Sequence, residues 1–236
     1  MPKFTRDEMV RFVDRLNQNG IKVRMTFTNT LLAEKHLDDE YCNLALEVLD
    51  NGFGNGIITA SPLLEDYIHT THPNLGLISS ITKGGDFETF KQAFEDDKYE
   101  MVVIYARVEI LDYLNSHATA EERGNRVEIL LSSGCGHCPI AKEHYAVESY
   151  NNLHQKEIKF HICYKDRIGY KEIIPQPKDE IIFDPNKFQA MNLCNFKIQG
   201  RRQSLERLAM GYSNTFFNFR HRSESLKNLS QMIRSV

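Results

Sequence analysis

Short apolar runs alternate with amphipathic stretches along most of the chain. The runs are a few residues long and rich in Val, Ile and Leu, which is typical of buried strands. Between them, apolar residues recur at helical spacing, as Phe87, Phe90 and Phe94 do. This alternation predicts βαβ units and a parallel sheet. Eight candidate strands can be counted, at residues 23–28, 56–59, 76–80, 101–105, 127–131, 158–163, 181–183 and 195–198.

Helix starts follow most of these runs. The first helix opens with a capping box at residues 5–8 and precedes the first strand. Later helix starts carry an N-capping residue, at Ser61, Asp86, Asp184 and Ser204. Eight parallel strands joined by helices are enough to close a barrel. We therefore expect one α/β domain over residues 1–236, a TIM-type (β/α) barrel that is either closed or truncated and irregular at its N-terminus.

Composition narrows the class of protein. The hydrophobic share of 41% and the charged share of 26% are ordinary for a globular domain with a sizeable core. The net charge of -3 argues against nucleic-acid binding through bulk charge, while a local basic patch stays open. No stretch reaches the roughly 20 apolar residues of a membrane span, and the N-terminus lacks a signal-peptide pattern. We expect a cytoplasmic protein that does not bind a membrane.

The sharpest local feature is a C-x-x-C motif, Cys135-Gly136-His137-Cys138, between a candidate strand and a helix. Five cysteines, two of them in this motif, suit metal or redox chemistry in a reducing compartment. Two thiolates at this spacing can bind one metal ion. Cys163, at the end of the next candidate strand, and His144 are the candidates that complete the site. We expect an irregular metal-binding excursion from the barrel at about residues 134–180.

The same motif has a second interpretation. C-G-H-C after an apolar strand and before a helix is also the redox motif of thioredoxin-like disulfide isomerases. Cys135 and Cys138 would then exchange with a disulfide, and the sheet would contain a central antiparallel pair. In those proteins the motif follows the first long strand, whereas here five candidate strands precede it.

Two other cysteines lie apart from this motif, and only Cys42 has a clear structural position. Cys194 directly precedes the last candidate strand, at the amino end of the expected barrel and away from the site. Cys42 falls on an apolar helical stripe, which predicts a core residue, with Ala45, Leu46 and Leu49.

Polar residues follow several of the candidate strands. In a parallel barrel the carboxyl ends of the strands share one face, where substrates bind. The last strand runs through a glycine turn and two arginines into a capped helix start, an arrangement that suits a phosphate or carboxylate. Solvated loops are polar for simpler reasons as well. We predict that a small anionic ligand is held by Asn29, Lys83, Lys197 and Arg201.

Residues 197–201, Lys-Ile-Gln-Gly-Arg, resemble the closing strand and turn of a known family, the collagenase-like peptidases and prephenate-dependent RNA hydroxylases. Residues 183–185 stand where that family has a helix start. Segments 26–29, 79–83 and 135–145 are similar to a bacterial branch of barrel proteins related to the family. The resemblance covers about residues 20–220 and implies a TIM-type barrel.

The resemblance also implies a chemistry. Members of the family hold a [4Fe-4S] cluster on four cysteines and hydroxylate without oxygen, or are named as peptidases. It therefore implies an iron–sulfur enzyme that modifies an RNA base or a small anionic molecule, with Cys135, Cys138 and Cys163 as cluster ligands. Here the fourth cysteine is missing from its usual position, and Gln199 replaces a glutamate of the closing motif. Zinc bound by the three cysteines and His144 is the competing cofactor, and a non-catalytic, zinc-stapled barrel for binding or assembly is the competing function.

Overall fold

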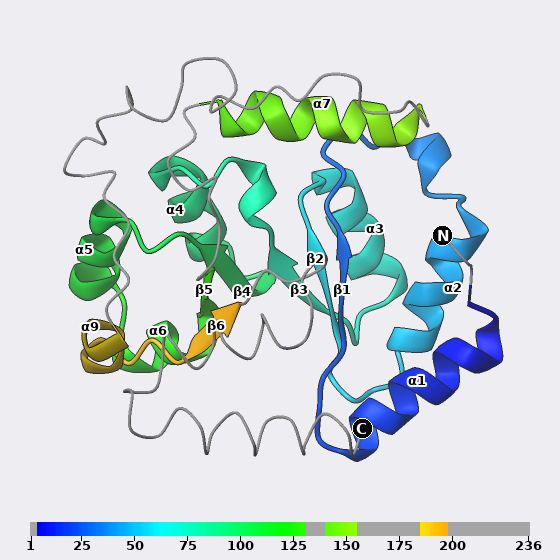
Figure 1. Ribbon diagram of the computed structural model, residues 1–236, viewed down its shortest axis with the longest axis horizontal. Coiled ribbons are helices and arrows are strands. Elements are labelled where there is room, and N and C mark those ends of the chain that lie inside the picture. Colours follow the sequence, from blue (N-terminus) through cyan, green and yellow to red (C-terminus); the bar gives the residue numbers. More distant parts are fainter. Residues whose placement is uncertain (1–3, 131–139, 155–184, 198–236) are drawn as a thin grey trace, which may run out of the picture.

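The computed structural model describes residues 4–130, 140–154 and 185–197 (Figure 1). The strands in these residues form one parallel sheet in the order β1-β2-β3-β4-β5-β6. Each strand lies beside the strands that precede and follow it in this series, which is the arrangement that successive βαβ crossovers of one hand produce. The strands are β1 (Arg24–Phe27), β2 (Gly56–Thr59), β3 (Gly76–Ser79), β4 (Tyr99–Ile104), β5 (Val127–Leu130) and β6 (Asn195–Lys197).

The helices begin where the capping residues predict. Thr5 forms a capping box with Glu8, and the side chains of Ser61 and Asp86 accept hydrogen bonds from amides in the first turns of α3 and α4. In the described residues no helix is long and apolar enough to cross a membrane. The helices are α1 (Arg6–Gln18), α2 (Glu40–Leu49), α3 (Pro62–Thr71), α4 (Phe87–Glu95), α5 (Val108–His117), α6 (Ala120–Arg126), α7 (Ala141–Leu153) and α9 (Pro185–Ala190), with 3-10 turns η1 (Glu34–His36) and η2 (Ile81–Lys83).

The sheet curls into a half-barrel. Arg24 on β1 and Glu128 on β5 form an ion pair, with 3.0 Å between Nη1 and Oε1. Strands four places apart in a flat sheet would lie about 19 Å from each other, farther than these two side chains reach together. The pair therefore requires β1 and β5 to face each other across a concave side of the sheet.

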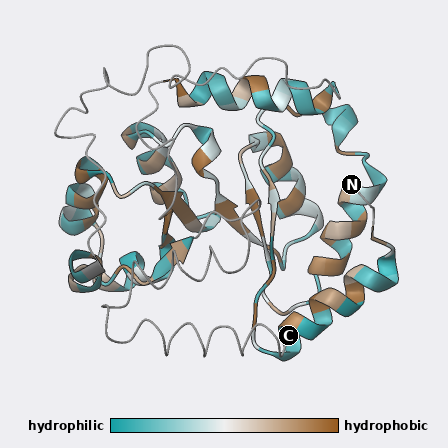
Figure 2. Ribbon diagram, viewed as in Figure 1, coloured by the Kyte–Doolittle hydropathy of each residue, from teal (hydrophilic) through white to brown (hydrophobic). Residues whose placement is uncertain are grey.

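The central strands of the sheet are coloured mainly as hydrophobic in Figure 2. Buried apolar side chains form a cluster on each of the two faces of the sheet. On the convex face, Ile57, Leu77 and Ile129 pack in one cluster with residues from the surrounding helices. Successive side chains of a strand point to opposite faces, so the strands read as continuous apolar runs when both faces are covered. The concave face carries a smaller cluster of Ile58, Ile78, Met101, Val103, Tyr105 and Leu130.

The predicted strands are confirmed where the structure describes them. β2 has the predicted bounds, and the other described strands agree to within two residues. β4 begins at Tyr99, two residues before the predicted start. The buried Tyr99 pairs with Leu77 of β3, and Met101 pairs with the next residue, Ile78. The exposed Glu100 is therefore an extra residue in β4, and it interrupted the apolar run in the sequence. Candidate strands 158–163 and 181–183 lie outside the described residues.

The order of the strands corrects two expectations. β5 pairs directly with β6, so neither of the two candidate strands between them in sequence stands between them in the sheet. The prediction of eight strands arranged in simple chain order is therefore wrong. The described strands form an open half-barrel with β1 and β6 at its edges. All pairs among the described strands are parallel, which contradicts the alternative of a thioredoxin-like sheet.

Removing one partner of the Arg24–Glu128 pair should destabilise the half-barrel more than removing both. Arg24→Met leaves Glu128, whose side chain is only 11% exposed, without its guanidinium, and we expect the free energy of unfolding to fall by about 2–4 kcal/mol. Arg24→Met with Glu128→Leu removes the guanidinium together with the mostly buried carboxylate, so most of that loss should be recovered. Urea unfolding measures both changes.

Arg6→Met is the matched control for this prediction. It removes an exposed pair of the same chemistry, with 2.9 Å between Arg6 Nη1 and Glu47 Oε2, and should cost less than about 1 kcal/mol. A double variant at positions 24 and 128 that is as unstable as Arg24→Met would show that the pair does not act as a unit.

Candidate functional site

Helix α7 lies across the carboxyl ends of the strands (Figure 1). Near its start, Lys142 Nζ is 3.8 Å from Oδ2 of Asp86, the N-cap of α4. Near its end, Ser149 contacts the residues that follow β1. Parallel barrels bind their substrates at this face, so the candidate site is the carboxyl face of the half-barrel, bordered by α7.

Ser149 attaches α7 to the end of β1. Its Oγ accepts hydrogen bonds from Thr30 N at 3.0 Å and from Thr30 Oγ1 at 3.1 Å, and its carbonyl accepts one from Asn29 Nδ2 at 2.9 Å. Ser149 is buried, whereas the other residues of α7 are partly or fully exposed. Asn29 thus lies at the predicted face with its amide engaged in holding α7, and its contact with a substrate stays a prediction.

Lys83 also lies at this face, in η2, and its ammonium group is paired. Lys83 Nζ is 2.6 Å from Oε1 of Glu65 on α3, a side chain with no exposed surface, and it donates a hydrogen bond to Tyr99 Oη. Tyr99 Oη in turn donates to Glu65 Oε2 at 2.6 Å. Burial and the hydrogen bond to the Glu65 carboxylate raise the pKa of Tyr99. These contacts hold the η2 turn in place, and a ligand would share the charge of Lys83 with Glu65.

The Glu65 carboxylate has a second lysine beside it. Lys98 Nζ lies 3.2 Å from Glu65 Oε2 and 3.4 Å from Asp96 Oδ2. Burial acts to lower the pKa of Lys98, but the two carboxylates outweigh it and the pKa is raised. The sequence patterns above did not single out Glu65. Its position could have indicated that it is buried, because it stands one turn after Ser61 and one turn before the fully buried Ile68, on the face of α3 that meets the sheet.

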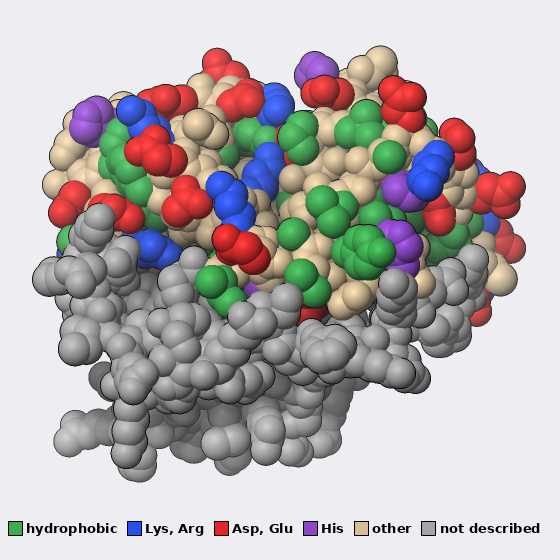
Figure 3. All heavy atoms as spheres, turned by 90° about the horizontal axis from the view of Figure 1, so that it is seen from above, with side chains coloured by type: hydrophobic (Ala, Val, Ile, Leu, Met, Phe, Trp, Pro, Cys, Tyr) green, Lys and Arg blue, Asp and Glu red, His purple; other side chains and the backbone are tan. Residues whose placement is uncertain are grey.

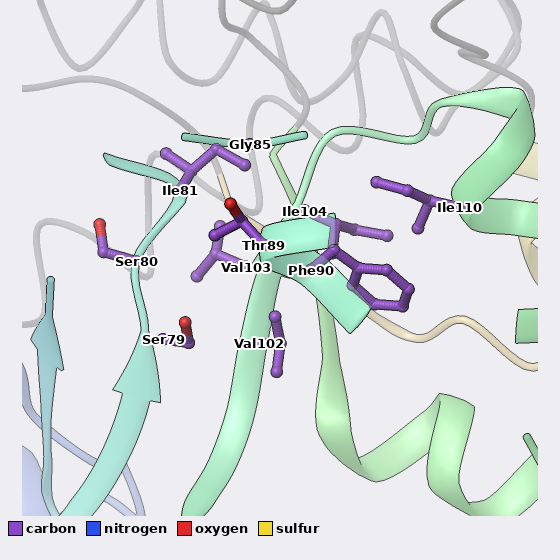
Figure 4. Close-up of a pocket in the computed structure, with 10 residues that line it drawn as sticks. All are labelled: Ser79, Ser80, Ile81, Gly85, Thr89, Phe90, Val102, Val103, Ile104 and Ile110. Atoms are coloured by element: carbon purple, nitrogen blue, oxygen red, sulfur yellow. The ribbon is translucent and has the colours of Figure 1, made fainter. Parts of the chain in front are cut away.

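A small pocket opens beside η2, between the carboxyl ends of β3 and β4 and the start of α4 (Figure 4). Its polar lining consists of the hydroxyl groups of Ser79, Ser80 and Thr89. Gly85 closes one side with φ 67°, a conformation that favours glycine, and a Cβ there would come within 3.1 Å of the Tyr105 ring. The full lining is Ser79, Ser80, Ile81, Gly85, Thr89, Phe90, Val102, Val103, Ile104 and Ile110.

Of the four predicted metal ligands, His144 alone lies in the described residues. Cys135, Cys138 and Cys163 lie outside the described residues, as does Arg201.

His144 lies one turn into α7 and has a carboxylate partner. Its Nε2 is 3.3 Å from Glu148 Oε1, its side chain is 15% exposed, and its ring stacks on Tyr145 with 5.7 Å between centroids. A carboxylate beside one imidazole nitrogen leaves the other nitrogen for a metal, as in many metal sites. Within the described ranges no three His, Cys, Asp or Glu residues gather to hold a metal ion, so His144 fits a site only together with the cysteines.

The remaining predicted residues lie elsewhere. Lys197 ends β6 and directs its Nζ to the concave side, 3.9 Å from Glu128 Oε2. Cys42 is partly buried on a helix face whose neighbours Ala45, Leu46 and Leu49 are buried, and Cys194 is exposed directly before β6. Both agree with the positions that the sequence predicts for them.

Charges of both signs are interspersed on the face seen from above the carboxyl ends (Figure 3). Lysine, arginine, aspartate and glutamate side chains alternate over the described part of this view, without a large area of one sign. A duplex-binding surface is marked by clustered Lys and Arg. The described part of this face shows no such cluster.

The half-barrel is similar to a solved structure of a U32 peptidase, Mk0906. The two chains are 14% identical and superpose with a TM-score of 0.51, over 84% of this chain and 77% of the peptidase. At this identity the likeness shows the fold alone, and it agrees with the relation to collagenase-like barrels that the sequence resemblance implies. No protein-family model and no curated protein sequence matches the chain.

Ser149→Ala should loosen α7 without unfolding the sheet. The change leaves Thr30 N without its acceptor, at a cost of about 1–3 kcal/mol to the docking of the helix. Hydrogen exchange of the α7 amides should accelerate, while exchange in β2 and β3 stays unchanged. Ser116→Ala is the matched control, because its hydroxyl bonds only to the Asp112 carbonyl in its own helix. Equal protection of α7 in wild type and Ser149→Ala would contradict this role.

Asp86 should make stability fall in acid. Burial acts to raise the pKa of Asp86, but hydrogen bonds from Thr89 and the charge of Lys142 outweigh it, and the pKa is lowered. A lowered folded-state pKa contributes stability that is present above the unfolded value, near 4, and is lost as pH falls through the folded value. Asp86→Asn keeps an N-cap but does not titrate. Urea unfolding from pH 6 to pH 3 should show a shallower fall for this variant, and identical slopes would contradict the assignment.

Proposed function

We propose that the chain is a metal-dependent enzyme whose site lies at the carboxyl face of the half-barrel, with Cys135, Cys138, Cys163 and His144 as ligands. The observation that carries this proposal is the position of α7. This helix begins three residues after the C-x-x-C motif and lies across the strand ends, where enzymes with parallel barrels bind their substrates. The fold likeness to a U32 peptidase is in keeping with a barrel enzyme.

The donor set decides which metal centre fits. A [4Fe-4S] cluster held by three cysteines has one iron without a protein thiolate, whereas zinc held by three thiolates and an imidazole makes a closed structural site. The His144–Glu148 contact is compatible with either, since the carboxylate orients the ring in both cases. We favour the cluster, because the closing motif resembles a family that carries one. When bound, the cluster would supply electron transfer or activation of the substrate.

The chain's own residues would bind and orient the substrate. Lys83 is held beside the strand ends by Glu65, and Lys197 ends β6. Together with Asn29 and Arg201 they form the proposed set of contacts to a small anionic molecule. An RNA base is the less favoured substrate, because the described part of the carboxyl face mixes both charges.

Anaerobic purification should yield a coloured protein that contains iron and sulfide. Cys135→Ser should remove the colour and the iron while the sheet stays folded, because its apolar clusters do not involve the metal. Elemental analysis and visible absorption measure the loss, and circular dichroism reports on the fold. Cys194→Ser is the matched control, since this exposed cysteine lies outside the proposed set.

The zinc alternative has a different signature. A colourless, zinc-loaded protein from strictly anaerobic preparation would indicate a structural zinc site in place of the cluster. Cys135→Ser should then lower the melting temperature markedly. Protein without any metal, with Cys135 and Cys138 freely titratable, would refute the metal centre altogether.

A further inference from the structure

Two cations meet one carboxylate on the concave side of the half-barrel. Arg24 Nη1 lies 3.0 Å from Glu128 Oε1, and Lys197 Nζ lies 3.9 Å from Glu128 Oε2. The three residues come from β1, β5 and β6, so the curl of the sheet brings the first of them to the other two. This group of three, which we call the interior charge cluster, carries one net positive charge.

Arg24 keeps hydrogen-bond donors that the described residues do not use. A guanidinium has five N–H donors in a planar fork. Within the described part of the chain, Nη1 is the nitrogen of Arg24 that has partners, Glu128 Oε1 and the sulfur of Met101 at 3.3 Å. The side chains of Arg24 and Lys197 are 26% and 30% exposed, against 11% for Glu128. Solvent therefore reaches the cations more readily than the carboxylate between them.

The neighbouring charges compensate each other. Lys22 Nζ lies 3.6 Å from Glu100 Oε1, near the amino ends of the strands. The Glu100 carboxylate occupies the space beside Gly76, where a Cβ would stand 1.8 Å from Glu100 Oε2. Glycine at this position thus lets Glu100 turn toward Lys22. The interior charge cluster, as the described residues give it, has two cations beside one carboxylate.

We propose that Arg24 and Lys197 form a binding site for one carboxylate or phosphate group. The Glu128 carboxylate competes with that group for the two cations. The unused edge of the Arg24 guanidinium can bind two oxygens of such a group, and Lys197 adds a second positive charge. Glu128 keeps Arg24 in position before the ligand arrives. The inference rests on the proposed function in one respect, because it takes the bound group as an anionic end of the substrate, held by Lys197 together with Arg24.

Glu128→Gln separates a ligand site from a purely structural ion pair. Neutralising Glu128 removes an anion that competes for both cations, so added phosphate or carboxylate should bind about fivefold more tightly or better, even though the protein becomes less stable. If Arg24 served only as the partner of Glu128, wild type would bind neither anion, and any binding would appear only in the Glu128→Gln variant.

Isothermal titration of the full chain with inorganic phosphate and with succinate, at constant ionic strength, tests the proposal. Wild type should bind one of the two with a dissociation constant of about 1 mM or tighter, and Arg24→Gln should weaken this by about tenfold or more. Arg24→Lys keeps the positive charge but not the planar set of donors, so its affinity for the anion should lie between those of wild type and Arg24→Gln. Arg6→Gln, which alters an exposed Arg–Glu pair of similar geometry, should bind as wild type does. The preferred anion tells a phosphate site from a carboxylate site.

Wild-type protein that binds neither anion would overturn the proposal, as would a Glu128→Gln variant that binds no more tightly. If Arg24→Gln does not fold, Lys197→Gln and Arg24→Lys carry the test. Titrating metal-free protein keeps the two proposals distinguishable. A wild-type protein that binds phosphate but takes up no metal refutes the metal centre alone, and a coloured wild-type protein that binds neither anion refutes the interior site alone.

Discussion

The contact between Arg24 and Glu128 is the constraint on which the shape of the sheet depends. Glu128 is mostly buried, and a buried carboxylate that loses its partner destabilises a protein by several kcal/mol. Its partner stands four strands away, so the pair survives only while the sheet is curled. The same curl brings the carboxyl ends of the strands together on one face. Helix α7 can then bridge from Asp86 before α4 to Thr30 after β1.

The carboxyl face is assembled from contacts that hold loops rather than from a preformed cleft. Glu65 fixes Lys83 and with it the η2 turn, and Ser149 fixes the end of α7. A buried carboxylate needs cations close by, so Glu65 also determines where two lysines lie. The loops after β1 and β3 are thereby set in place.

The two proposed sites occupy different levels of the half-barrel. Arg24 begins β1 and Asn29 follows its end, a separation of five residues, or about 16 Å along an extended strand. The metal centre is proposed at the carboxyl face, whereas the anion site is proposed on the concave side below it, with Lys197 reaching down from the end of β6. The two sites differ in chemistry, thiolates in one case and a guanidinium with an ammonium in the other.

The sequence by itself determined the local features of this protein. Apolar runs marked the described strands to within two residues, and capping residues such as Ser61 marked helix starts, because both depend on neighbours a few positions away. It also pointed to the cysteine motif, whose signal is spacing alone. Only the tertiary structure decided that β5 pairs with β6, that Glu65 is buried with two lysines, and that Arg24 meets Glu128. These are contacts between residues far apart in the chain, and they arise from the curl of the sheet and the packing of helices on it, which no local pattern encodes.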